Sequence, residues 1–233
     1  MVEIRLEGPG MNCLGTTMMT WLLGQLEQAG GAPVLLTGAG RAFSAGLDLR
    51  EVAGLTPDSA HDFLDLLVRT MHRVYTHPGP VVAWVNGHAI AGGSLLALAC
   101  DFAYAGSDSR ARIGLNEIAL GLRFPPGLLA LVREQIPRQH LAEVVLGAGL
   151  HSAADAAGLG LITAAVPDPE SAARACLDRL AAHPADAYAA AKADLRCSVM
   201  ATSPDLTRRF QEEVLPLWTS PQLKAKVLAL LER

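Results

Sequence analysis

Residues 81–93 read VVAWVNGHAIAGG, and this stretch decides the kind of fold that the chain can form. The apolar run 81–85 has the length of a buried strand, and Asn86-Gly87 ends it. The small residues that follow let the backbone approach a ligand closely, and a turn that enters a helix leaves N–H groups free. The stretch therefore predicts a buried strand followed by a loop that presents backbone donors.

A second stretch of the same design lies upstream, where residues 34–49 read VLLTGAGRAFSAGLDL. It again places a short apolar run before a glycine-bearing turn. Two such turns could aim two N–H donors at one oxygen, which would form an oxyanion hole. Neither turn matches the Gly-x-Gly-x-x-Gly dinucleotide fingerprint or the phosphate loop with its Lys-Ser/Thr ending.

The rest of the chain predicts an α/β protein. Residues 2–6 alternate apolar and charged side chains as a half-exposed strand does, and residues 14–29 show helical spacing with Trp21 on the apolar face. Thr56-Pro57 opens a helix, and 162–166 could be a last strand. Strands that alternate with helices predict an α/β core over residues 1–166. Residues 167–233 form a C-terminal helical region, whose helices start at Asp168-Pro169, His183-Pro184, Ser203-Pro204 and Ser220-Pro221.

Composition excludes several classes of protein. The net charge is −4 with both signs interspersed, which gives no footprint for nucleic acid. No apolar run reaches the ~18–20 residues of a membrane span. A charged, strand-like segment follows Met1 directly, so we expect no signal peptide and a cytoplasmic protein. The cysteines are scattered without CxxC spacing and the histidines lack ligand spacing, so we expect buried reduced thiols and no metal site.

The two glycine-bearing motifs, Phe43–Leu49 and Asn86–Gly93, resemble the oxyanion-hole segments of the crotonase (enoyl-CoA hydratase/isomerase) family. The resemblance implies a crotonase-like (ClpP/crotonase) spiral core of ββα units and an acyl-CoA thioester as the substrate. Coenzyme A is then part of the substrate, and no separate cofactor is expected. The backbone N–H groups of Leu47 and Gly92 would hold the thioester oxygen as it becomes an enolate.

The same resemblance assigns binding roles around these donors. The backbone at Ala45 would help bind the adenine ring of coenzyme A, and Leu49 and Leu95 would belong to the substrate site. Arg50 could contact the coenzyme A phosphates or could be a solvated arginine at a helix start. Asp48 is expected to cap that helix, and His88 is expected to be structural rather than a base.

The catalytic acids indicate the subtype. Hydratases of this family carry one glutamate at the position of Leu95 and a second at the position of Glu117, so this chain has only the second. The Ile113–Glu117 motif, Ile-Gly-Leu-Asn-Glu, resembles the mitochondrial-type Δ3,Δ2-enoyl-CoA isomerases. One carboxylate can take a proton from C2 and return it at C4, and apolar Leu95 would raise the pKa of that acid. An isomerase is therefore predicted.

Alternatives remain open at this stage. Glu117 could be an ordinary surface acid, and Arg123–Pro126 replaces the usual glycine-rich segment, so the acyl pocket is expected to differ. The chain could instead be an atypical hydratase, another crotonase-family enzyme such as an acyl-CoA hydrolase, or a catalytically silent acyl-CoA-binding subunit. The C-terminal tail has seven apolar residues: Val214, Leu217, Trp218, Leu223, Val227, Leu230 and Leu231. They predict a homotrimer or a dimer of trimers, unless the tail folds back on its own core.

Overall fold

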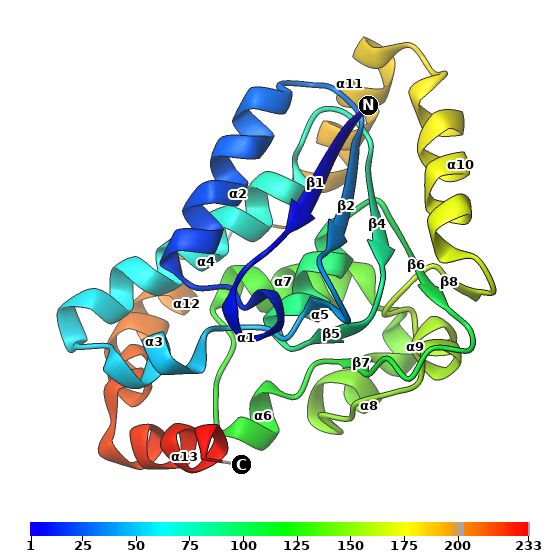
Figure 1. Ribbon diagram of the computed structural model, residues 1–233. Helices are drawn as coiled ribbons and strands as arrows, with labels where there is room; N and C mark the ends of the chain where they lie inside the picture. Colours follow the sequence, from blue (N-terminus) through cyan, green and yellow to red (C-terminus); the bar gives the residue numbers. More distant parts are fainter. Residues whose placement is uncertain (198, 200–202, 233) are drawn as a thin grey trace.

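Two parallel β-sheets form the centre of the protein in a computed structural model that describes residues 1–197, 199 and 203–232. The larger sheet has the strand order β1-β2-β4-β6-β8, and the smaller has the order β3-β5-β7 (Figure 1). The larger sheet consists of β1 (Val2–Leu6), β2 (Val34–Gly38), β4 (Val81–Val85), β6 (Phe102–Gly106) and β8 (Ala164–Val166). The smaller consists of β3 (Ala42–Ser44), β5 (His88–Ile90) and β7 (Ile113–Gly114).

The two sheets arise from a repeated ββα unit. Within each repeat the first strand joins the larger sheet and the second joins the smaller one, in the pairs β2 and β3, β4 and β5, and β6 and β7. β2 and β4 pair in parallel with Val34 opposite Val81. Both strands are covered on two faces, which is why their sequences are continuous apolar runs rather than alternating ones. The expected spiral core of ββα units is confirmed.

Helices cover both faces of the larger sheet. α2 (Thr16–Ala29) and α4 (Pro57–Tyr75) lie on one face, and α10 (Pro169–Ala181) lies on the other (Figure 1). The expectation for Trp21 was wrong, because that side chain is 39% exposed. The buried stripe of α2 runs through Met18, Leu22 and Leu26, which recur every fourth residue, and Trp21 lies beside this stripe.

Four of the predicted helix starts are confirmed by side-chain caps, and α11 (Ala185–Arg196) begins after His183-Pro184 without one. The Thr56 hydroxyl accepts from Ser59 N–H within a capping box, and the side chains of Asp168, Ser203 and Ser220 likewise accept from the third residue of their helices. The remaining elements are α1 (Pro9–Asn12), α3 (Leu49–Gly54), α5 (Gly92–Ala99), α6 (Glu117–Leu120), α7 (Pro126–Gln135), η1 (Arg138–His140), α8 (Leu141–Leu146), α9 (Ala153–Leu159), α11 (Ala185–Arg196), α12 (Pro204–Arg209), η2 (Phe210–Val214), η3 (Leu215–Thr219) and α13 (Pro221–Leu231). No helix in the described part of the chain combines the length and apolarity of a membrane span.

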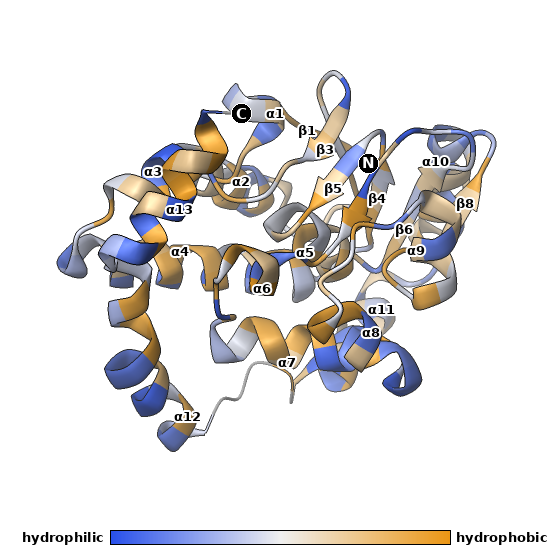
Figure 2. Cartoon of the chain, turned by 90° about the horizontal axis from the view of Figure 1, so that it is seen from below, coloured by the Kyte–Doolittle hydropathy of each residue, from blue (hydrophilic) through white to orange (hydrophobic). Residues whose placement is uncertain are grey.

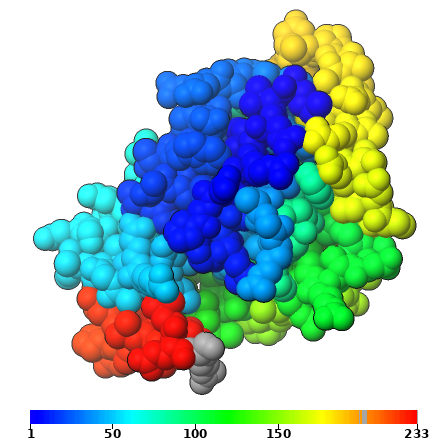
Figure 3. Space-filling view, in the orientation of Figure 1, coloured from blue at the N-terminus to red at the C-terminus, as the bar shows by residue number. Residues whose placement is uncertain are grey.

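The C-terminal tail folds back, in part, on its own chain. α13 packs against α3, and the two lie together at the lower left of Figure 1 and of the space-filling view in Figure 3. Four of the seven apolar tail residues are buried, whereas Leu217 is 48% exposed and Leu231 is 40% exposed. The division of the chain at residues 166 and 167, and the trimer, stay predictions.

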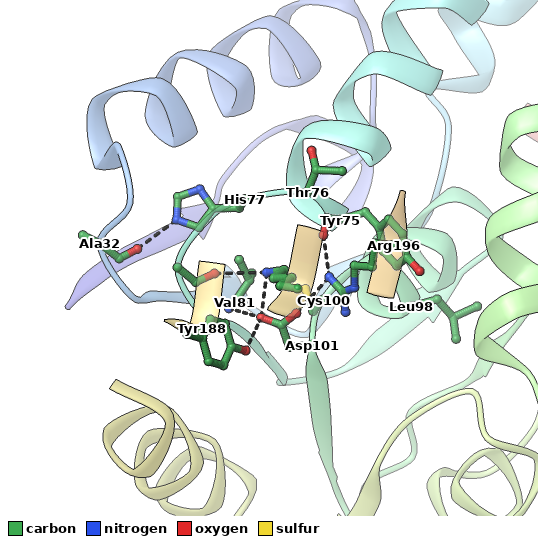
Figure 4. Close-up of polar contacts among 12 residues, drawn as sticks. Ala32, Tyr75, Thr76, His77, Val81, Leu98, Cys100, Asp101, Tyr188 and Arg196 are labelled. Atoms are coloured by element: carbon green, nitrogen blue, oxygen red, sulfur yellow. Dashed lines mark hydrogen bonds and ion pairs between the residues drawn. The ribbon is translucent and has the colours of Figure 1, made fainter. Parts of the chain in front are cut away.

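α11 is attached to the core by charge rather than by an apolar face. Its only buried residues are Lys192 and Arg196. Both donate to Asp101, from Lys192 Nζ at 2.8 Å and from Arg196 Nη1 at 2.8 Å. The Asp101 carboxylate also accepts from Tyr188 Oη and from Val81 N–H (Figure 4). One buried carboxylate therefore connects α11 to the start of β4.

Candidate active site

Three strand ends bring the candidate catalytic groups together. β3, β5 and β7 are neighbouring parallel strands, so their carboxyl ends meet at one edge of the smaller sheet. Leu47 follows β3, Gly92 follows β5, and Glu117 follows β7. The two loops touch there, because a Cβ built on Gly92 would lie only 3.6 Å from Leu47 N. Ligand sites of parallel sheets commonly occupy this position.

The backbone leaves both predicted donors unused. Leu14 N–H donates to Gly46 O at 2.7 Å, and Leu14 O accepts from Asp48 N–H at 3.2 Å. Leu14 therefore pairs with the residues on either side of Leu47, and the N–H of Leu47 itself faces away from Leu14. Gly92 is the first residue of α5, where an N–H has no partner within the helix. Among the described residues, neither N–H donates to a protein acceptor.

Small residues are required where the two loops meet. Gly46 has φ +92°, and a Cβ there would lie 2.7 Å from Ile90 O and 3.3 Å from Gly92 N. Ala91 also has a positive φ, of 49°, which is uncommon for a residue with a side chain. This conformation lies at the turn between β5 and α5, directly before Gly92.

Glu117 is a buried acid without a partner. It begins α6, the residue is 7% exposed, and neither carboxyl oxygen has a hydrogen-bond partner among the described residues. Because burial disfavours the charged form, the pKa of this carboxyl rises from its ordinary 4.5 to about 8. The reading of Glu117 as an ordinary surface acid is wrong.

One cavity of about 270 Å³ contains these groups. Residues of α4, α5, α6, α7 and α13 line it. In Figure 2, α6 lies between the other four helices. Of the residues predicted for the site, the cavity wall includes Ala45, Leu47, Leu49, Gly92, Leu95 and Glu117. Arg50 is exposed at the start of α3 and does not line the cavity, which fits both of the roles expected for it. The rest of the wall is mostly apolar and includes Leu67, Ile90, Leu120, Leu122, Phe124, Leu128 and Leu230.

Three further lining residues carry nitrogen-bearing side chains, and of these only Arg123 belonged to a segment expected to affect the acyl pocket. Asn116 Oδ1 and Trp218 Nε1 are buried with no hydrogen-bond partner among the described residues, and Arg123 is exposed. Asn116 precedes the catalytic position in the motif, so its neighbourhood was visible in the sequence. Trp218 was expected to belong to an apolar tail at a subunit interface, and the structure places it in the wall of this cavity. No local pattern connects Trp218 to Glu117, because both line this cavity only once the tail has folded.

The structural roles expected of nearby residues are confirmed. Asp48 Oδ1 accepts from Arg50 N–H and Glu51 N–H and so caps α3. His88 Nδ1 accepts from Arg112 N–H at 3.1 Å. The four cysteines are free, although Cys13 is only half-buried and Cys197 is exposed, so not all the thiols are buried as expected. Within the described residues no cluster of three or more metal-ligating side chains occurs.

Two backbone N–H groups without acceptors among the described residues, on loops that meet near a buried acid, suit an enzyme that moves a proton next to a carbonyl group. A family model described as enoyl-CoA hydratase/isomerase matches residues 1–222. The chain belongs to the enoyl-CoA hydratase/isomerase family.

Individual relatives carry both family names. One relative is a Thermus thermophilus protein that carries a provisional enoyl-CoA hydratase name, and it is 38% identical over 164 residues. These residues make up 67% of this chain and 63% of the relative. Human mitochondrial enoyl-CoA delta isomerase 1 is 30% identical over 173 residues, or 72% of this chain and 57% of the relative. The chain thus spans about three fifths of these relatives. The crystal structure of human mitochondrial Δ3-Δ2-enoyl-CoA isomerase superimposes with a TM-score of 0.89 at 26% identity, covering 99% of this chain and 92% of that one.

Proposed function

We propose that the protein converts 3-enoyl-CoA thioesters to 2-enoyl-CoA thioesters. The observation that carries this proposal is the set of ionisable groups around the cavity. Glu117 is the one acid among the described residues of the wall, and Leu95 stands where a second acid would be needed for hydration. A single carboxyl group that releases and takes up a proton is enough for a double-bond shift.

The proton movement starts and ends on Glu117. The carboxylate takes a proton from C2, and the electron pair spreads from the thioester oxygen to C4 as a dienolate. The N–H groups of Leu47 and Gly92 donate to that oxygen, and removal of one such donor typically costs ~3–4 kcal/mol of barrier. The Glu117 carboxyl then gives its proton to C4, which leaves the double bond between C2 and C3. Because only a proton moves, the reaction calls for no redox cofactor or metal.

Hydration would ask more of this cavity. Adding water across C2=C3 requires one group to activate the water and one to protonate C2. Leu95 has no proton to give or take, and it adds apolar surface beside Glu117. That surface raises the proton affinity of Glu117, as a base for C2 requires, while it offers nothing to a water molecule.

The experiment compares the two reactions on matched substrates. Wild-type protein receives a 3-enoyl-CoA and its 2-enoyl isomer, and isomerisation and hydration are followed by product analysis. Isomerisation should exceed hydration by at least about a hundredfold, the range of one positioned acid or base. Leu95→Glu should gain hydration, whereas the control Leu95→Gln, of similar size, should not. Comparable rates in wild type would show that the site hydrates, and no reaction with either substrate would favour a silent binding subunit.

A further inference from the structure

The cavity adjoins a second hollow at Arg123 and Phe124. These two residues line both spaces, and the second hollow has a volume of about 360 Å³. Leu47, Gly92 and Glu117 line only the first space. A substrate that reacts beside Glu117 and extends as far as Arg123 therefore has its far end at the boundary between the two spaces.

The second hollow is positively charged. Arg123, Arg133 and Arg209 line it, with Glu213 as the one acid of the described lining. Arg209 pairs with Glu213 at 3.4 Å. Arg123 and Arg133 form no ion pair with any described residue. Two guanidinium groups are thus left to bind an anion.

A buried donor lies in the wall of the first space. Trp218 is 3% exposed, and its indole Nε1 has no hydrogen-bond acceptor in the part of the chain that the structure describes. An indole N–H can only donate, and a guanidinium has donors and no acceptor. A buried N–H without a partner is costly, so an acceptor on the ligand would stabilise this arrangement. Trp218 and Arg123 line the same cavity, and both can donate hydrogen bonds to an acceptor on a ligand.

We propose that the preferred substrate carries a carboxylate at the far end of its acyl chain, so that it is the coenzyme A monothioester of an unsaturated dicarboxylic acid. This inference rests on the proposed function and names its substrate class. A carboxylate is the acceptor that a guanidinium binds with two parallel hydrogen bonds. The apolar walls formed by Leu122, Phe124 and Leu128 suit the methylene groups between the thioester and this carboxylate.

The test measures binding without turnover, so that it stays readable if isomerisation fails. Saturated acyl-CoA thioesters of several chain lengths are titrated by calorimetry, each as a methyl-terminated and a carboxyl-terminated form. At the best length, wild type should bind the carboxylated form at least about tenfold more tightly, as expected for hydrogen bonds to a charged group. Arg123→Gln should abolish that preference, and Trp218→Phe, which keeps the ring and removes the N–H, should reduce it. Arg138→Gln changes an exposed arginine outside both spaces and should leave it intact.

Two results would overturn the proposal. One is equal affinity of wild type for both forms at every length. The other is an Arg123→Gln variant that weakens methyl-terminated acyl-CoA and free coenzyme A as much as the carboxylated form, because Arg123 would then bind the coenzyme A phosphates. Circular dichroism of each variant establishes that the fold is retained, and Arg123 is exposed, so its substitution leaves the core unchanged.

Discussion

Replacing Glu117 with glutamine should abolish activity and, above about pH 5, stabilise the fold. Below pH 4.5 the Glu117 carboxyl carries its proton in both the folded and the unfolded chain, so it contributes no pH dependence. As the pH rises, the unfolded chain loses that proton first, because burial holds the folded pKa at about 8. The folded protein therefore loses stability across this window, and glutamine, which has no charge to bury, removes the loss.

The size of the effect follows from the two pKa values. Each pH unit between 4.5 and about 8 costs the wild-type protein ~1.4 kcal/mol. The accumulated difference is about 3 kcal/mol at pH 7 and about 4 kcal/mol at pH 8. A buried amide without hydrogen-bond partners in the same place changes the free energy of unfolding by an amount that does not vary with pH. The diagnostic quantity is therefore the slope of the free-energy difference between variant and wild type against pH.

Urea denaturation followed by circular dichroism at a series of pH values measures this slope directly. The free energy of unfolding of Glu117→Gln minus that of wild type should grow steadily from pH 5 to pH 8. Glu143→Gln, at an exposed position on α8, is the matched control and should follow wild type throughout. Parallel profiles for Glu117→Gln and wild type would refute the burial argument. Turnover of Glu117→Gln should fall at least about a hundredfold while acyl-CoA binding persists.

Three further predictions address the pH profile, the α11 attachment and assembly. If the Glu117 carboxylate is the base, kcat/KM should rise about tenfold per pH unit up to its pKa of about 8 and then level off. A flat profile from pH 6 to 9 would show that another group is the base. Asp101→Asn leaves Lys192 and Arg196 buried without their anion and should lower the unfolding free energy by ~3–5 kcal/mol in urea titrations, whereas an unchanged midpoint would show that α11 is held by other contacts. Light scattering should report a trimer or hexamer that dissociates or becomes insoluble on truncation after Pro204; a stable monomer at micromolar concentration contradicts this.

The parts of the site that the sequence predicts are those that depend on local chemistry. Leu47 and Gly92 follow short apolar runs and small residues, a pattern that predicts a strand and then a tight loop. Their roles and that of Glu117 came from the resemblance of the surrounding motifs to the crotonase family. The structure places all three residues after neighbouring strands of the smaller sheet.

The contributions of the tail were not predictable in this way. An apolar residue such as Trp218 is equally compatible with its own core, with a neighbouring subunit or with a ligand cavity. The apolar pattern predicts that the side chain is buried, but it does not predict which surface covers it. The prediction that Trp21 lies on the buried face of α2 was wrong for a related reason. Its spacing fits a helix, but the buried stripe passes through the neighbouring residue Leu22. Arg123 was noticed as a departure, yet its link to a second hollow depends on η2 and α12, which come from the tail.

The tail also affects how strongly Glu117 holds its proton. Trp218 and Leu230 lie far from Glu117 in the sequence, yet they belong to the wall of the cavity that holds its carboxyl group. In a chain truncated after Pro204, water would reach this carboxyl, and its pKa would fall toward that of a free glutamate. The proposed base would then be too weak to take a proton from carbon.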